Sequence, residues 1–458
     1  MKTISDAISA LIPYAEWIML IFVVGGGLYL AIHSRLLPYR YFRHAINITR
    51  GKYDDPNDPG EVIHIQALSA AVAATVGLGN ISGVAIAIYK GGPGVIFWIW
   101  ITAIIGMCVK FYSCSLAVMY RENDEEKGIL SGPMHYITLG IGKKARPLAV
   151  FFCVAGLIGF LAVFTTNQFT QTFMNVVKPD STIASIGDAN WKWIVGLCCA
   201  GATSFVVFGG LKKITKVTTA IVPFMVMLYL IAVLIIMAFN VDKILPSLQL
   251  IITEAFNLNT MIQGGFWGMV ILGVRRAVFS NESGLGSAPM YHGQSKTDEP
   301  VKEGLVAMLG PFIDTIVVCT LTAIVIISSG AYLEAESNGI LMTLIAFKKS
   351  LFGYGDVLLM IIVSSFALST MFTYSYYGTK CLSFLFKTNM SKAYNIFYVI
   401  TIIWAAGASV DFVLNLIDLS YALMCIPNMI AVIYLAPRIT KRMKAYTNTL
   451  RQNKVRAS

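Results

Sequence analysis

The sequence predicts an all-α membrane protein with about eleven transmembrane helices, and three observations support this fold class. Charged residues make up 13% of the 458 residues, against about 25% in an average soluble domain. Apolar residues make up 56%, and they gather in segments of about 20 residues, the length that crosses a bilayer as a helix. Few segments alternate like strands, and lipid tolerates only helices or closed barrels. This composition excludes a soluble enzyme, a disordered chain and a nucleic-acid-binding module.

The predicted spans form one transmembrane domain over 1–458. An extra N-terminal helix is expected at 14–33, and a basic tail at 437–458 follows the last span. The ten spans between them divide into two halves, 65–239 and 259–436. The predicted segments are 65–89, 94–119, 148–174, 192–209, 215–239, 259–290, 301–329, 355–385, 392–410 and 413–436. Because five is odd, the two halves have opposite orientations in the membrane, which is typical of inverted repeats in transporters.

The positions of Lys and Arg predict the orientation. With the C-terminal tail placed inside, 24 of the 35 Lys and Arg residues lie on its side of the membrane and seven lie on the opposite side. Positive residues concentrate on the cytoplasmic side of membrane proteins. The sequence therefore predicts a multi-pass protein of the cell membrane with the N-terminus outside and the C-terminus in the cytoplasm.

The first interrupted span is 65–89, in which Gly77, Gly79 and Gly83 fall within seven residues about halfway across. Each glycine destabilises a helix interior by about 1 kcal/mol relative to alanine. An unwound stretch leaves backbone groups unpaired, which a membrane tolerates only beside a cavity or ligand. Free amides suit a carboxylate and free carbonyls suit a cation. We expect a ligand site here, with close helix packing through small residues as the alternative.

The second interrupted span is 259–290. As one helix its 32 residues would be about 48 Å long, against a hydrocarbon core of about 30 Å. Its glycines predict two half-helices with a break near 267–273. Paired breaks in corresponding positions of two halves indicate the central site of a transporter.

Two motifs carry a resemblance to a known family. TVGLGNISGVAIAIYKGGPGVIFWIW at 75–100 and RRAVFSNESGLGSAP at 275–289 closely resemble the alanine or glycine:cation symporter family of the amino acid-polyamine-cation superfamily. The resemblance covers essentially the whole chain. It implies the 5+5 inverted-repeat fold of the neurotransmitter:sodium symporters and sodium-driven import of a small neutral amino acid, alanine or glycine. Leu78 departs from the family, which usually has threonine there.

The expected substrate contacts combine the residues with this resemblance. The amides of Gly77 and Gly79 are expected to hold the substrate carboxylate. Gln168 is expected to reach the amine or carboxylate, and Phe266 and Trp267 to cap the methyl side of a small pocket, with plain packing as the alternative for both aromatics. The predicted substrate-binding residues are Thr75, Gly77, Gly79, Asn80, Gln168, Phe266 and Trp267.

The predicted sodium site rests on a hydroxyl cluster in span 355–385. Ser364, Ser365, Ser369, Thr370 and Thr373 lie there in an apolar context, and hard cations prefer oxygen ligands. Hydroxyls within a helix also bond to its own carbonyls, which is the alternative. The resemblance selects the sodium ligands: carbonyls or side chains of Ala73, Thr75, Val76, Asn80, Phe366, Ser369 and Thr370.

Charged residues within the spans are candidates for a gate or an ion-pair network. They are Lys110, Arg275, Arg276, Glu282 and Asp314, and a proton relay through Asp314 is the alternative. Two alternative functions remain: a proton-coupled amino acid permease and a sodium:glutamine symporter of the same family. Residues 355–379 contain no Lys or Arg. Since a basic side chain often replaces the second sodium in proton-coupled relatives, this absence favours sodium.

Other function classes lack their signatures. The sequence contains no HExxH motif, no paired aspartates in glycine-rich motifs and no repeated pore loop. Its eight cysteines lie in apolar runs without a CxxC pair. We therefore expect a transporter and not an enzyme. The resemblance implies Na⁺ as co-transported ion, and no organic cofactor is expected. Its partners are the amino acid, sodium and the lipid bilayer, without nucleic acid, and the oligomeric state stays open.

Overall fold

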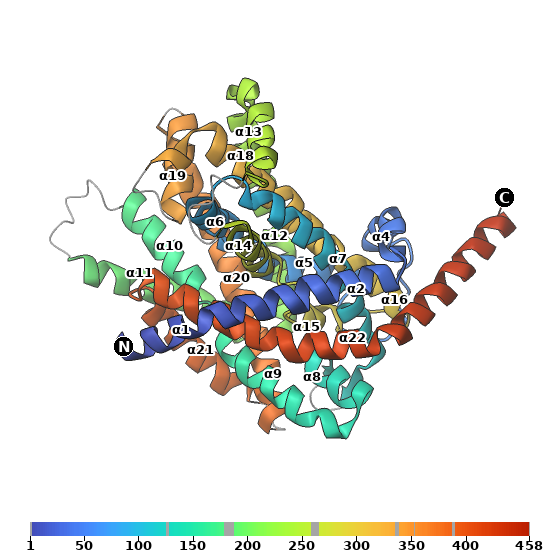
Figure 1. Cartoon of the computed structure of the whole chain (residues 1–458). Coiled ribbons are helices and arrows are strands. Elements are labelled where there is room, and N and C mark those ends of the chain that lie inside the picture. Colours follow the sequence, from blue (N-terminus) through green and yellow to red (C-terminus); the bar gives the residue numbers. More distant parts are fainter. Residues whose placement is uncertain are drawn as a thin grey trace.

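The computed structural model describes residues 2–124, 128–177, 187–257, 265–334, 339–351, 353–386 and 390–457. This part of the chain is almost entirely helical, and its only sheet is a hairpin of two short strands (Figure 1). The hairpin pairs β1 (Glu122–Asp124) with β2 (Gly128–Leu130) in antiparallel register. The all-α fold class predicted from composition is confirmed.

The first half of the chain begins with one continuous helix, in which a short π-helical stretch, η1, lies between α1 and α2. Its elements are α1 (Lys2–Met19), η1 (Leu20–Gly25), α2 (Gly26–His33), α3 (Leu37–Arg40) and α4 (Phe42–Thr49). The elements after these are α5 (His64–Thr75), η2 (Gly79–Gly83), α6 (Val84–Gly91), α7 (Val95–Met119), α8 (Pro133–His135), η3 (Tyr136–Ile141), η4 (Lys143–Ala145), α9 (Arg146–Gly159), α10 (Val163–Val176), α11 (Asp188–Val207), α12 (Gly210–Phe239) and α13 (Val241–Glu254).

The second half ends in a helix of 48 residues, α22 (Val410–Ala457), which continues from the last predicted span through the basic tail. Figure 1 shows its C-terminal turns projecting from the molecule. The other elements are α14 (Gly265–Asn281), α15 (Ala288–His292), α16 (Pro300–Ala307), α17 (Leu309–Pro311), η5 (Phe312–Cys319), α18 (Thr320–Ser328), η6 (Ala331–Leu333), α19 (Ile340–Ser350), α20 (Gly355–Phe386) and α21 (Ser391–Ala405).

Seven helices of the described residues are long and apolar enough to cross a membrane, and the bent pair α5–α6 makes an eighth candidate. These eight coincide with eight of the eleven predicted spans. The other three predicted spans correspond to α11, α14–α15 and α21, which are helical but do not meet the same length and hydropathy. The first residues of the span at 259–290 lie outside the described residues. The total of eleven spans therefore stays a prediction.

The first predicted break is confirmed. Helix α5 ends at Thr75, and the chain leaves helical geometry at Val76, whose ψ is 88°. Helical structure resumes at Gly79, and the two pieces are bent by 50°. The glycines that follow Val76 allow the turn because they add no side chain to a crowded interior.

The second predicted break is placed wrongly by the sequence. Residues 267–273 lie inside the continuous helix α14. The helix ends at Asn281, and the irregular stretch is 282–287, where Glu282, Gly284 and Gly286 have φ of 54°, 85° and 86°. Gly273 serves packing instead: a Cβ there would lie 2.5 Å from Cβ of Trp98. Glycine alone weakens a helix. The close packing against a neighbouring helix that Gly273 allows compensates for this cost.

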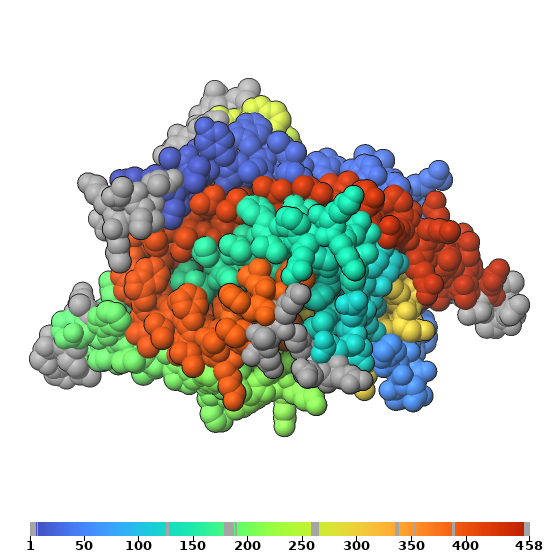
Figure 2. Space-filling model, turned by 90° about the horizontal axis from the view of Figure 1, so that it is seen from below, coloured from blue at the N-terminus to red at the C-terminus, as the bar shows by residue number. Residues whose placement is uncertain are grey.

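Helices from both halves pack around the first break. Helix α20 contacts α5, α10 and α12, and α14 contacts η2 and α7. The N-terminal helix α1 lies along α22, as Figures 1 and 2 both show. Because each half supplies helices to this packing, residues far apart in sequence meet at the α5–α6 break.

Candidate functional site

The break between α5 and α6 borders a small buried cavity of about 20 Å³. A cavity of this size holds about one water molecule. Its walls come from five separate stretches of the chain: the α5–α6 break, the start of α10, the end of α14, the middle of α20 and α22. The lining residues are Ala74, Thr75, Gly77, Leu78, Gly79, Leu161, Phe164, Thr165, Phe279, Thr370, Tyr374, Ile417 and Tyr421.

A cluster of oxygen atoms joins α20 to the last turn of α5. The Thr370 hydroxyl lies 3.3 Å from the carbonyl oxygen of Ala73 and 3.1 Å from that of Phe366. The Ser369 hydroxyl lies 3.4 Å and 2.9 Å from the same two carbonyls. Both hydroxyl side chains are buried. The structure thus brings together four of the predicted sodium ligands, while Val76 ends α5 one turn further on.

Asn80 links the break to a second polar cluster. Its side-chain oxygen accepts a hydrogen bond from the Gly77 amide at 3.2 Å, and its side-chain nitrogen donates to the Asp314 carbonyl at 2.9 Å and to the Asp314 carboxylate. The Ser280 and Thr315 hydroxyls donate to that carboxylate at 2.9 and 2.8 Å. Asp314 is fully buried. In the part of the chain that the structure describes, no Lys, Arg or His forms an ion pair with it.

Aromatic rings close the apolar side of the cavity. The Phe279 ring meets Phe164 edge-on, with centroids 4.8 Å apart, and lies 5.9 Å from the ring of Tyr421. The hydroxyls of Tyr374 and Tyr421 are 2.9 Å apart, and Tyr374 donates to the Glu282 carboxylate at 2.6 Å. These rings form the apolar wall of the cavity.

Four predicted substrate contacts do not line this cavity: Asn80, Gln168, Phe266 and Trp267. Phe266 and Trp267 lie at the far end of α14, where Phe266 packs edge-on against Trp98 at 5.3 Å and Trp267 is 59% exposed. Their predicted position depended on the misplaced break. Gln168 is fully buried and accepts a hydrogen bond from Ser82, on η2 beyond the break. Thr75, Gly77 and Gly79 do line the cavity.

A buried ion pair covers the cavity on the side of α14. The Arg276 guanidinium bonds to Asp418, and Asp418 also lies 3.5 Å from Arg275, which pairs with Glu16. The Arg276 guanidinium stacks over the Phe279 ring, with its carbon 4.9 Å from the ring centroid. Of the five charged residues expected in a gate or ion-pair network, Arg275 and Arg276 form one, and it covers an aromatic wall of the site. Lys110, Glu282 and Asp314 form no ion pair among the described residues.

A second closure lies toward the tail of α22. Residues 59–62 are strapped to 293–297 by backbone hydrogen bonds such as Glu61 to Gln294 at 2.8 Å and Lys296 to Val62 at 2.7 Å. The Arg121 guanidinium donates to carbonyls of both segments, including Pro59 at 2.8 Å and Ser295 at 2.7 Å.

Beneath this strap, the buried carboxylate of Glu303 bonds to both His64 and His292. These three side chains join the start of α5, the end of α15 and α16. Ionic and hydrogen-bonded contacts thus join helices on both sides of the cavity.

Sequence reasoning missed the aromatic lining of the cavity. Phe279 lies within the motif at 275–289, three residues before the true irregular stretch, so a break placed at the SNESGLG run would have identified it. Tyr374 is one helical turn from Thr370 and on the same face of α20. Leu161, Phe164, Ile417 and Tyr421 carry no local signal, because only the packing of α10 and α22 brings them to the break.

The fold is similar to that of a solved protein structure. The structure described as MhsT in complex with L-phenylalanine superposes with a TM-score of 0.58 over 84% of this chain and 99% of that chain, at 14% sequence identity. At this identity the similarity shows the fold alone.

The sequence is similar to known transporters along its length. The sodium/alanine symporter AgcS of Methanococcus maripaludis is 36% identical over 445 residues, 96% of each chain. A protein of Bacillus subtilis described as the probable sodium/glutamine symporter GlnT is 30% identical over 95% of this chain and 89% of its own. The profile described as the sodium:alanine symporter family matches residues 1–458. The chain therefore belongs to the sodium:alanine symporter family and is a transporter, not an enzyme.

Proposed function

We propose that this protein imports a small neutral amino acid, alanine or glycine, together with sodium by alternating access. The observation that carries the proposal is the buried oxygen cluster at Ala73, Phe366, Ser369 and Thr370, directly beside a helix break that borders a small cavity. An ion at the cluster and an amino acid in the cavity would contact the same unwound backbone, which couples their binding.

The oxygen cluster suits sodium. Its described oxygens are two backbone carbonyls and two hydroxyls, all neutral, so a single positive charge is stabilised without an excess of negative charge. We propose that Ala73, Val76, Phe366, Ser369 and Thr370 hold the ion. With the ion bound, each hydroxyl would turn its lone pairs toward it instead of donating to the carbonyls.

A second cation position is proposed at Asn80 and Asp314, with Thr75 at the end of α5 as a further ligand. The Asp314 carboxylate is buried among Asn80, Ser280 and Thr315 without an ion-pair partner among the described residues. A buried carboxylate is costly unless it is paired, protonated or bound to a cation. Sodium at this position supplies that charge, whereas protonation of Asp314 would make the carrier proton-coupled.

The substrate is proposed to bind between the break and the aromatic wall. As the first residue of η2, Gly79 has an amide without an intrahelical acceptor, which suits a carboxylate. Thr75 and Gly77 complete this wall. Gln168, which accepts a hydrogen bond from Ser82, is proposed to affect substrate binding indirectly, by positioning η2. Phe279 and Phe164, and not Phe266 and Trp267, limit the side chain. This limit favours alanine or glycine over the glutamine named for the Bacillus subtilis relative.

Alternating access is proposed to move two halves, 65–239 and 259–436, about the break. Three pairs of helices in corresponding positions of these halves are in contact: α7 with α16, α9–α10 with α20, and α11 with α21. Contacts between corresponding elements support an inverted repeat. The Arg276–Asp418 pair is proposed as the outer closure and the Arg121 strap as the inner closure, with the N-terminus outside and the tail in the cytoplasm.

The test is uptake by the purified protein in proteoliposomes. We expect concentrative uptake of alanine and glycine with an inward sodium gradient, and none with potassium or choline in its place. A screen of the twenty amino acids at equal concentration establishes the substrate. Uptake driven by a proton gradient without sodium, or better competition by glutamine than by alanine, would refute the proposal.

A further inference from the structure

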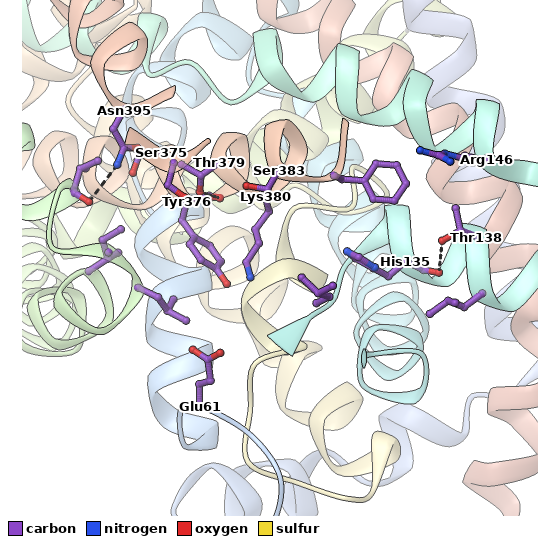
Figure 3. A pocket seen from close by; sticks show the side chains of 18 of the residues that line it. Glu61, His135, Thr138, Arg146, Ser375, Tyr376, Thr379, Lys380, Ser383 and Asn395 are labelled. Atoms are coloured by element: carbon purple, nitrogen blue, oxygen red, sulfur yellow. Dashed lines mark hydrogen bonds between the residues drawn. The ribbon is translucent and has the colours of Figure 1, made fainter. Parts of the chain in front are cut away.

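A much larger cavity, of about 800 Å³, lies toward the cytoplasmic end proposed above. The ends of α9, α12, α20 and α21 and the strand β2 surround it (Figure 3). In this view Lys380 extends from α20 into the space above Glu61, while Arg146 and Thr138 lie on one side and Asn395 on the other.

This cavity is separate from the site at the helix break. Thr370 and Tyr374 line the small cavity, whereas Ser375, Thr379 and Ser383 line the large one. At about 100° per residue, these two sets lie on opposite faces of α20. Since the two cavities share no lining residue, the large cavity is not an extension of the proposed substrate site.

Three basic side chains line this cavity. Lys143, Arg146 and Lys380 line it, and none of the three forms an ion pair in the part of the chain that the structure describes. Lys380 donates only one hydrogen bond there, to the Ile129 carbonyl at 3.0 Å. The only carboxylate of the lining, Glu61, accepts from the Ile129 amide at 3.0 Å. The net charge of the lining is therefore positive.

Neutral polar groups lie among these cations. Burial and the nearby Lys380 charge lower the pKa of His135 to about 4, so its imidazole is neutral near pH 7 and can donate or accept a hydrogen bond. The hydroxyls of Thr138, Thr379 and Ser383 also line the cavity. Lysine, arginine and hydroxyl groups together are the typical partners of a phosphate group.

Part of the remaining lining is apolar. Leu130, Leu139, Val207, Leu211, Ile214 and Phe384 form this part, and Leu139 is 42% exposed at the surface. Ser375, Tyr376, Ser391 and Asn395 add further polar side chains. A ligand that fills both parts must combine an anionic group with a hydrocarbon portion. Basic pockets between transmembrane helices near the cytoplasmic surface bind phospholipid headgroups.

We propose that this cavity binds a phosphate ester, with Lys143, Arg146 and Lys380 around the phosphate and the apolar lining against a hydrocarbon chain. In the membrane, the ligand with this chemistry is an anionic phospholipid. In solution, it is a small phosphate ester. The apolar lining favours the phospholipid. The binding site is expected to stabilise the ends of α9, α12 and α20 against one another.

The experiment measures the melting temperature of the full-length protein, purified without added lipid, after addition of four probes. These are phosphatidylglycerol, phosphatidylcholine, glycerol 3-phosphate and inorganic phosphate. We expect phosphatidylglycerol to raise the melting temperature by several degrees and phosphatidylcholine to raise it much less. An equal rise with glycerol 3-phosphate or inorganic phosphate would support the phosphate site and assign it to a soluble ligand.

Paired substitutions test the location. Lys143→Gln with Arg146→Gln should remove at least half of the rise caused by phosphatidylglycerol. The matched control is Lys441→Gln with Lys444→Gln, which removes two exposed cations of the tail that do not line the cavity; it should keep the full rise. An equal loss in both pairs, or an equal rise with phosphatidylcholine, would overturn the proposal. Native mass spectrometry of the same samples counts the bound lipid and covers the case in which binding does not change the melting temperature.

Discussion

Gly77 is the position where the smallest change should disturb the sodium site most. A Cβ at Gly77 would lie 2.5 Å from Oγ1 of Thr370, well inside contact distance, so Gly77→Ala must displace either the break or the hydroxyl. Thr370 is proposed to hold sodium, and its hydroxyl lies 3.3 Å from the Ala73 carbonyl. Inserting a methyl group into a packed interior costs about 1–3 kcal/mol. If the Thr370 hydroxyl moves away from sodium to relieve that strain, sodium affinity falls about 5- to 150-fold, since 1.4 kcal/mol corresponds to a factor of ten.

The assay is alanine binding to the purified protein, titrated with sodium at constant ionic strength. We expect the half-saturating sodium concentration to rise at least about fivefold in Gly77→Ala, while the protein elutes as wild type in size-exclusion chromatography. Gly83→Ala is the matched control, because a Cβ there meets only Phe279 at 3.8 Å, an ordinary contact, and should change the value less than twofold. A folded Gly77→Ala protein with wild-type sodium dependence would refute the placement of the ion at Thr370.

Three further predictions concern the ligands and the pocket. Ser369→Ala combined with Thr370→Ala should raise the sodium concentration for half-maximal uptake and lower alanine affinity only through linkage between the two sites. A loss of alanine affinity that is as large at saturating sodium as at low sodium would contradict this. In competition binding, Phe279→Ala should let leucine compete with alanine, while Trp267→Ala, which alters an exposed residue, should not. The reverse result would place the substrate pocket at the N-terminal end of α14, beside Trp267. Asp314→Asn removes the negative charge of a proposed sodium ligand and should weaken sodium-dependent binding by at least tenfold, whereas a loss confined to proton-driven uptake would identify Asp314 as a proton carrier.

The two closures differ in chemistry, and this difference suggests how each opens. The α14 side is covered by the ion pair of Arg276 and Asp418, both buried. The tail side is held by backbone hydrogen bonds between 59–62 and 293–297 and by the Arg121 guanidinium on carbonyls. Opening the tail side therefore separates the segment before α5 from the segment after α15, the two elements that also flank the breaks.

Sequence patterns by themselves determined the fold class and the first break. Spans such as 94–119 and 355–385 were predictable because a run of about 20 apolar residues has one stable form in lipid. The break at Gly77 and Gly79 was predictable because several glycines in mid-span weaken a helix locally. The hydroxyls of Ser369 and Thr370 were selected by the resemblance to a known family, and the structure places them beside Ala73.

Only the tertiary structure decided where α14 ends and what surrounds the site. The sequence predicts a break at Gly273, but a Cβ there would lie 2.5 Å from Cβ of Trp98 on a neighbouring helix, and packing between helices leaves no signal in the local sequence. The same reason explains why Phe164 and Tyr421 were missed: each lies on an apolar span, and nothing in that span distinguishes a side chain that faces the cavity from one that faces lipid. Asp314 was recognisable as a buried charge, but its contact with Asn80 joins residues 234 positions apart, a distance that only the folded chain closes.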